Sequence, residues 1–182
     1  MTSRRKLIAA VLGPAALVIA AAAGWAGHYG AFEHDDDDHQ GQPGLVLAMG
    51  NAQISLQQGL AASEHEGQPI SGSFEVEDGK FQLSIYTTKD GRFSEVLVDY
   101  VTAKVVHAWR LAEDDDIYAL DPQSAAMAKA TIPLKDAVTK ALSEHAGYRA
   151  VGIVPDLKDG HPVASVLLLK ADQFKTVREA LD

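Results

Sequence analysis

Apolar and polar residues follow three different patterns along this chain of 182 residues. Residues 7–23 form an uninterrupted apolar run directly after three basic residues. Two later segments, which begin at Leu56 and Leu134, space their apolar residues as an amphipathic helix does. After each of these segments apolar and polar residues alternate, which is typical of strands with one buried face. The pattern therefore predicts an apolar amino-terminal segment followed twice by a helix and then strands.

Residues 1–26 have the layout of an export signal. The basic residues Arg4, Arg5 and Lys6 favour the cytoplasmic side of a membrane, and small residues suited to a signal peptidase follow the apolar run. The run is at the short limit for a membrane span and contains Gly13-Pro14, so a cleaved signal and an uncleaved membrane anchor both fit. The adjacent arginines also fit a twin-arginine signal. Each alternative predicts export of the remaining chain to the periplasm or the cell envelope.

The rest of the chain is expected to form an α+β fold with two units, each a helix packed on a small antiparallel sheet. Composition and turn residues set the boundaries of its segments. The segments are a flexible His- and Asp-rich lead (27–44), the first unit (45–111), an acidic linker with a short helix (112–130) and the second unit (131–182). Tight hairpin turns are predicted at Asp78-Gly79, Asp90-Gly91 and Asp159-Gly160.

The two units repeat at an offset of about 80 residues. Residues 54–60 match residues 132–138, and the Asp-Gly turn at Asp78 matches the turn at Asp159 with a slightly larger offset. Ser55 is suited to cap the first helix, and Pro133 is suited to begin the second. Gly67 and Gly147 are predicted to hold the left-handed position that ends each helix.

Residues 54–60 and 98–106 resemble the PepSY family. The second stretch, Val98-Asp99-Tyr100-Val101-Thr102-Ala103-Lys104-Val105-Val106, is similar to the family's Val-Asp-x-x-Thr-Gly-Lys-Val signature. The resemblance covers about residues 50–110, with a degenerate copy over about 130–182 that lacks the signature. Ala103 replaces the family's glycine, so we expect this turn not to be left-handed without strain.

The resemblance implies a small exported domain with a helix on an antiparallel sheet and no catalytic residues. It also implies interaction with, or restraint of, an envelope or secreted protein such as a peptidase. Asp99 and Thr102 are expected to organise the turn, while Val98, Val105 and Val106 pack in the sheet.

Charge and composition narrow the possible partners. Without residues 1–26 the chain keeps 13 basic and 25 acidic residues, a charge of −12. Such a charge repels phosphate backbones and anionic lipids, so we expect no nucleic acid and no membrane contact beyond the amino-terminal segment. The absence of cysteine excludes disulfides and thiolate sites. No serine-nucleophile elbow, zinc-binding helix or phosphate loop occurs, so we expect no enzyme.

Two acidic runs are candidate sites for a divalent or trivalent metal cation, and no other cofactor is expected. Carboxylates suit hard cations such as Ca²⁺, and imidazoles favour Zn²⁺, Cu²⁺ or Ni²⁺. A solvated lead and a linker are the alternative interpretations of the same runs. The first run is His34, Asp35, Asp36, Asp37, Asp38 and His39, and the second is Glu113, Asp114, Asp115 and Asp116.

The other histidines have simpler interpretations. His65 and His145 suit the last turn of a helix, where the dipole favours them. His107 is expected on a sheet face and His161 in a turn.

The leading functional hypothesis is a non-catalytic binding module that acts through a sheet face or an exposed edge strand, which could pair with a strand of its target. The alternative is a periplasmic protein that binds or buffers metal cations.

Overall fold

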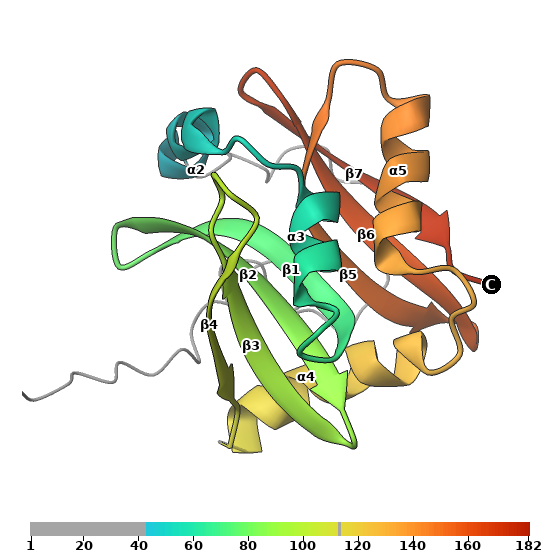
Figure 1. The fold of residues 1–182 in the computed structure, drawn as a ribbon. Coiled ribbons are helices and arrows are strands. Elements are labelled where there is room, and N and C mark those ends of the chain that lie inside the picture. Colours follow the sequence, from blue (N-terminus) through green and yellow to red (C-terminus); the bar gives the residue numbers. More distant parts are fainter. Residues whose placement is uncertain (1–42, 113) are drawn as a thin grey trace, which may run out of the picture. The chain divides into compact units, whose positions relative to one another are not determined.

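The computed structural model of the chain describes residues 43–112 and 114–182 (Figure 1). Their helices are α2 (Pro43–Ala48), η2 (Met49–Asn51), α3 (Leu56–Ser63), α4 (Asp114–Met127) and α5 (Leu134–Glu144). Their strands are β1 (Gln68–Glu77), β2 (Lys80–Lys89), β3 (Arg92–Val98), β4 (Val105–Arg110), β5 (Arg149–Lys158), β6 (His161–Lys170) and β7 (Gln173–Ala180). The α+β class predicted from the sequence is confirmed.

The seven described strands form one antiparallel sheet in the order β4-β3-β2-β1-β5-β6-β7. Each half of the chain contributes a run of consecutive hairpins, β1 to β4 and β5 to β7. The halves join where β1 pairs with β5, at Gly72–Ile153 and Ser73–Gly152. This pairing, which the sequence did not indicate, gives both first strands a neighbour on each side, so neither is left as an open edge.

Strands β1, β2 and β3 of the first half correspond to β5, β6 and β7 of the second, and β4 has no counterpart among the described strands. Bulges interrupt the two halves at equivalent places, after Pro69 in β1 and after Ala150 in β5. Asp78 and Asp159, which begin the first hairpin turns, have φ angles of 48° and 52°. With the positive φ angles of Gly79 (73°) and Gly160 (83°), these values confirm the predicted tight hairpin turns, because left-handed turn residues match the twist of closely connected strands.

The segments before α3 and α5 are also held in the same way. The Tyr100 carbonyl accepts backbone hydrogen bonds from Gln53 (2.9 Å) and Ile54 (3.2 Å). The Leu181 carbonyl accepts the corresponding bonds from Thr131 (2.7 Å) and Ile132 (2.9 Å). Helix α3 has 8 residues and α5 has 11, so the longer second helix accounts for the larger offset of the strands that follow.

Helices α3 and α5 contact each other and lie in front of the sheet in Figure 1. Ser55 caps α3 as predicted, because its hydroxyl accepts the Gln58 N–H while the Gln58 side chain accepts the Ser55 N–H. Leu56 and Leu60 of α3 are fully buried. Gly59 lets α3 approach the sheet closely, since a Cβ at this position would clash with the side chain of Leu83.

The ends of the two helices differ. Gly147 has a φ of 84°, as predicted for a residue that ends a helix. The prediction was wrong for Gly67, which does not have a positive φ. A Cβ on Gly67 would lie 2.7 Å from the backbone oxygen of Thr88, so the glycine serves close backbone approach at the start of β1.

Helix α4 packs against β5, β1 and β6 and lies behind the sheet in the view of Figure 1. Its buried residues include Leu120, Ala126 and Met127. Pro122 lies inside the helix, where it removes one backbone N–H from the helical hydrogen bonds. The acidic linker predicted between the two units therefore leads into a helix that contributes to the core.

The turn before β4 has the left-handed form that was expected only with strain. Ala103 has a φ of 59°, so it adopts the left-handed conformation that its side chain disfavours. The expected turn chemistry is present, because Asp99 Oδ1 accepts hydrogen bonds from the backbone of Val101 (2.9 Å) and Thr102 (2.7 Å). These bonds and the Ala103 N–H bond to the Asp99 carbonyl hold the turn in its strained form.

Candidate functional site

The metal ligands predicted from the sequence lie largely outside the described residues. Residues 34–39 and Glu113 are not among them, and residues 114–116 form the first turn of α4. Within the described ranges, no group of three or more histidine, aspartate or glutamate residues is placed to hold a metal ion. The two acidic runs remain predictions.

Three of the four described histidines, His107, His145 and His161, each make a separate local contact. His145 Nδ1 lies 2.8 Å from the Ala141 carbonyl at the end of α5. His107 packs its ring 5.0 Å from that of Trp109 on β4, as expected for a sheet-face residue. His161 begins β6 and lies 2.8 Å from Asp182, whose pKa is lowered mainly by this hydrogen bond. These contacts suit structural roles.

Carboxylates gather on the sheet face that points away from α3. Gly72 of β1 faces α3, so the odd-numbered side chains that follow the bulge in this strand point to the other face. There Gln82 of β2 donates hydrogen bonds of 2.8 Å to both Glu75 and Glu77. Ser73 donates a longer bond of 3.3 Å to Glu75. One amide thus bridges two carboxylates of the same strand.

The pKa of Glu75 is raised to about 7, chiefly because its carboxyl is buried and in part because Glu95 and Glu77 carry like charges. Glu95 is buried and accepts a hydrogen bond from Ser84. The sequence did not single out this group, because polar residues that alternate with Phe74 normally indicate an exposed face. The feature that reveals this group is the pairing register of the strands, which sets polar residues of β1, β2 and β3 side by side.

Strand β4 forms one edge of the described sheet and exposes apolar surface. Val105 and Val106 expose 36% and 65% of their surface, and Val101 in the preceding turn exposes 40%. The pairing of β4 with β3 is irregular next to Val98, which shortens the regular part of the edge. Exposed valines on a sheet edge are typical of a surface that receives another strand.

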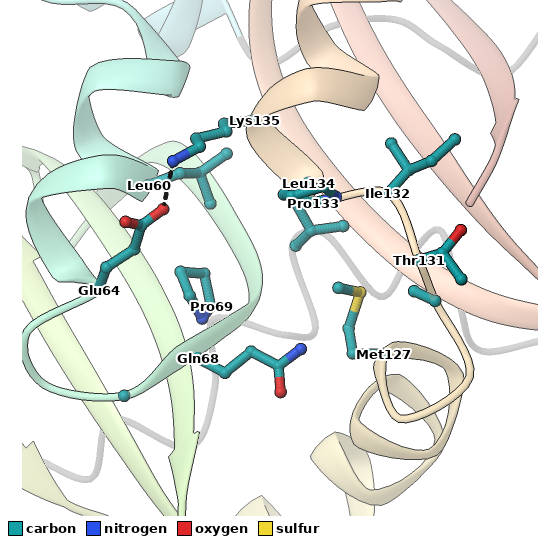
Figure 2. Close-up of a pocket in the computed structure, with 12 residues that line it drawn as sticks. Leu60, Glu64, Gln68, Pro69, Met127, Thr131, Ile132, Pro133, Leu134 and Lys135 are labelled. Carbon is teal, nitrogen blue, oxygen red and sulfur yellow. Dashed lines mark hydrogen bonds and ion pairs between the residues drawn. The ribbon is translucent and has the colours of Figure 1, made fainter. Parts of the chain in front are cut away.

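A cleft of about 340 Å³ lies between the carboxyl end of α3 and the amino end of α5 (Figure 2). Glu64 and Lys135 form an ion pair of 2.7 Å on its wall, and Glu64 raises the pKa of Lys135. Gln68 extends from the start of β1 toward Met127 (Figure 2). The remaining lining residues are Leu60, Gly67, Pro69, Ala130, Thr131, Ile132, Pro133 and Leu134.

Comparisons with known proteins show no family for this chain. No family model matches it, and no curated protein matches it. A solved structure from Clostridium difficile 630, provisionally described as a lipoprotein, is 14% identical and has a TM-score of 0.33. The match covers 64% of this chain and 86% of the other. The PepSY resemblance therefore stays a prediction.

No helix in residues 43–112 and 114–182 is both long and apolar enough to cross a bilayer.

Proposed function

We propose that this chain is an exported, non-catalytic binding module whose β4 edge receives an extended segment of a partner protein. The observation that supports this proposal is the exposure of Val105 and Val106 on an edge strand. No described strand pairs with the outer side of β4, so its outward backbone groups can bond to an added strand. Main-chain bonds would supply affinity, and the valines would supply contact surface.

The charge of the edge indicates the chemistry of the partner. Residues 104–110 carry Lys104 and Arg110 and no acidic residue, although the whole chain has a net charge of −9. A segment that alternates apolar and acidic side chains would complement this edge. The PepSY resemblance suggests a secreted or envelope peptidase as its source, and the sequence of residues 1–26 supports the same compartment.

Site-specific photo-crosslinking tests the proposal in the host envelope. A photoreactive residue is placed at Val106 in the full-length chain and, as a control, at Leu47 of α2, which exposes 81% of its surface. The segment captured from position 106 is then synthesised, and its binding is followed by amide hydrogen exchange. We expect new protection confined to residues 105–110.

A matched pair of substitutions completes the test. Val106→Asp is expected to weaken peptide binding at least tenfold, because it adds a negative charge beside an acidic strand. Leu47→Asp is expected to leave binding unchanged. Protection outside β4, or equal weakening by both substitutions, would contradict the proposed edge site.

A further inference from the structure

The segment that lines the cleft is a structural repeat of the segment before α3. Residues 49–56 and 127–134 share Met, Ala, Ile and Leu at the same four positions. Each segment donates two backbone hydrogen bonds to one carbonyl, that of Tyr100 or that of Leu181. Met127 and Ala130 of the cleft therefore correspond to Met49 and Ala52.

In the first copy, an arginine fills the space beside this segment. Arg149, the first residue of β5, donates from Nη1 to the Met49 carbonyl (2.8 Å) and from Nη2 to the Ala52 carbonyl (3.0 Å). A guanidinium group suits this task, because its planar fork can reach two acceptors at once.

In the second copy, the residue that corresponds to Arg149 is Gln68, the first residue of β1. The register supports this correspondence, since Gln68 faces Thr88 near the end of β2 and Arg149 faces Leu169 at the equivalent place in β6. Gln68 is shorter and uncharged. Its side chain points toward Met127, and the cleft lies around it (Figure 2).

The carbonyls that correspond to the acceptors of Arg149 are those of Met127 and Ala130. No described side chain donates a hydrogen bond to either of them. The cleft walls add the apolar side chains of Leu60 and Ile132 and the Glu64–Lys135 ion pair, whose charges offset each other. A planar fork of donors on an aliphatic stem would meet two carbonyl acceptors and apolar contact.

We infer that the cleft binds a guanidinium group on an aliphatic chain, in the position that Arg149 occupies in the other half. The volume of about 340 Å³ is at the small end of ligand pockets and suits one such side chain or a small molecule. Free arginine or agmatine and an arginine of another protein offer the same group. This site is separate from the β4 edge and does not depend on the function proposed there.

Methionine-methyl NMR of the full-length chain in detergent micelles tests the inference, because the chain has three methionines. Titration with agmatine is expected to shift the Met127 signal and leave that of Met49 unchanged, since Arg149 already fills the site beside Met49. n-Pentylamine, which carries a positive charge without a fork, is expected to require at least tenfold higher concentration. An equal response to both amines, or no shift of Met127, would overturn the site.

Two reciprocal substitutions strengthen the test. Gln68→Arg should fill the cleft from within the chain and abolish the Met127 response to agmatine. Arg149→Gln should open the first copy, so that Met49 begins to respond. If Arg149→Gln does not fold, Gln68→Arg decides alone, and an unchanged Met127 response in that variant would contradict the inference.

The source of the guanidinium group is decided by two further probes, free arginine and N-acetylarginine methylamide. Tighter binding of the capped compound would support the site and assign it to an arginine side chain of a protein partner. Tighter binding of free arginine would support the site and assign it to a small molecule.

Discussion

Gly72 of β1 lies directly opposite Ile153 of β5, at the position where the two halves of the sheet meet. Ile153 is also the residue that corresponds to Gly72 in the repeat, so the repeat relates this pair to itself and places a local twofold axis there. The register between β1 and β5 contains only one further pair, Ser73–Gly152. Contacts between α3 and α5 and the Glu64–Lys135 ion pair reinforce this short junction.

Substitution at this junction should be costly. A Cβ on Gly72 would clash with the Ile85 side chain and lie 3.5 Å from that of Leu60. We expect Gly72→Ala to lower the free energy of unfolding by about 1–3 kcal/mol, as other overpacked cores show. Urea unfolding measures the change. Gly50→Ala is the control, because its added methyl meets no atom within 4 Å, and an equal loss in both variants would contradict the explanation.

The left-handed alanine before β4 predicts a stabilising substitution. Ala103→Gly removes the steric cost of a φ of 59°, and we expect a gain of about 1 kcal/mol in the free energy of unfolding. Thermal or urea unfolding is the measurement. Ala108→Gly, in β4, should instead lose about 0.5–1 kcal/mol, because glycine is unfavourable inside a strand. A loss at position 103 would show that the turn is not strained there.

The buried carboxyl of Glu75 predicts a pH dependence of stability. Its folded-state pKa of about 7 lies above the ordinary value of 4.5, so the folded state holds its proton more tightly than the unfolded state. Its contribution to stability is complete below pH 4.5 and is lost as the pH rises through 7. The full loss corresponds to about 3 kcal/mol.

Glu75→Gln removes this titration. We expect the variant to be more stable than the parent at pH 8 and similar to it at pH 4.5, in urea unfolding at both values. Glu66→Gln, at an exposed position, is the control and should not change the difference between the two pH values. A parent chain whose stability is unchanged between pH 5 and 8 would show that the Glu75 pKa is not raised.

The cap of α3 predicts a coupling between two side chains. Ser55 and Gln58 satisfy each other's backbone N–H, so Ser55→Ala is expected to cost about 1 kcal/mol. In a double-mutant cycle with Gln58→Ala, the two losses should not add, because either substitution breaks the reciprocal pair. Gln53→Ala, at an exposed position outside this cap, is the control. Full additivity would mean that the pair does not act together.

Much of the fold follows from local patterns. The apolar period predicted α3 and α5, and the Asp-Gly pairs predicted three hairpin turns, because a type of turn requires particular residues at particular positions. The incorrect prediction of a left-handed Gly67 also came from a local pattern. Glycine fits both a left-handed helix end and close backbone approach, and only the neighbouring Thr88 decides between them.

The candidate sites were much less visible in the sequence. The carboxyl of Glu75 becomes buried through residues on neighbouring strands, and the cleft is defined by comparison with Arg149, which lies in the other half of the chain from Gln68. Neither relation has a local signature. The acidic runs that composition emphasised fall mainly outside the described residues.

Four features could be predicted from the amino-acid pattern alone: the α+β class, the order of helix and strands in each half, the Ser55 cap and the Asp-Gly turns. These features depend on side chains within a few positions of one another, whose local energies act in any context. Three features became visible only in the folded chain: β1 and β5 join the halves into one sheet, β4 lies at an edge, and Gln68 takes the place that Arg149 has in the other half. Each of these depends on contacts between residues far apart in the chain, whose energies exist only when the whole sheet has formed.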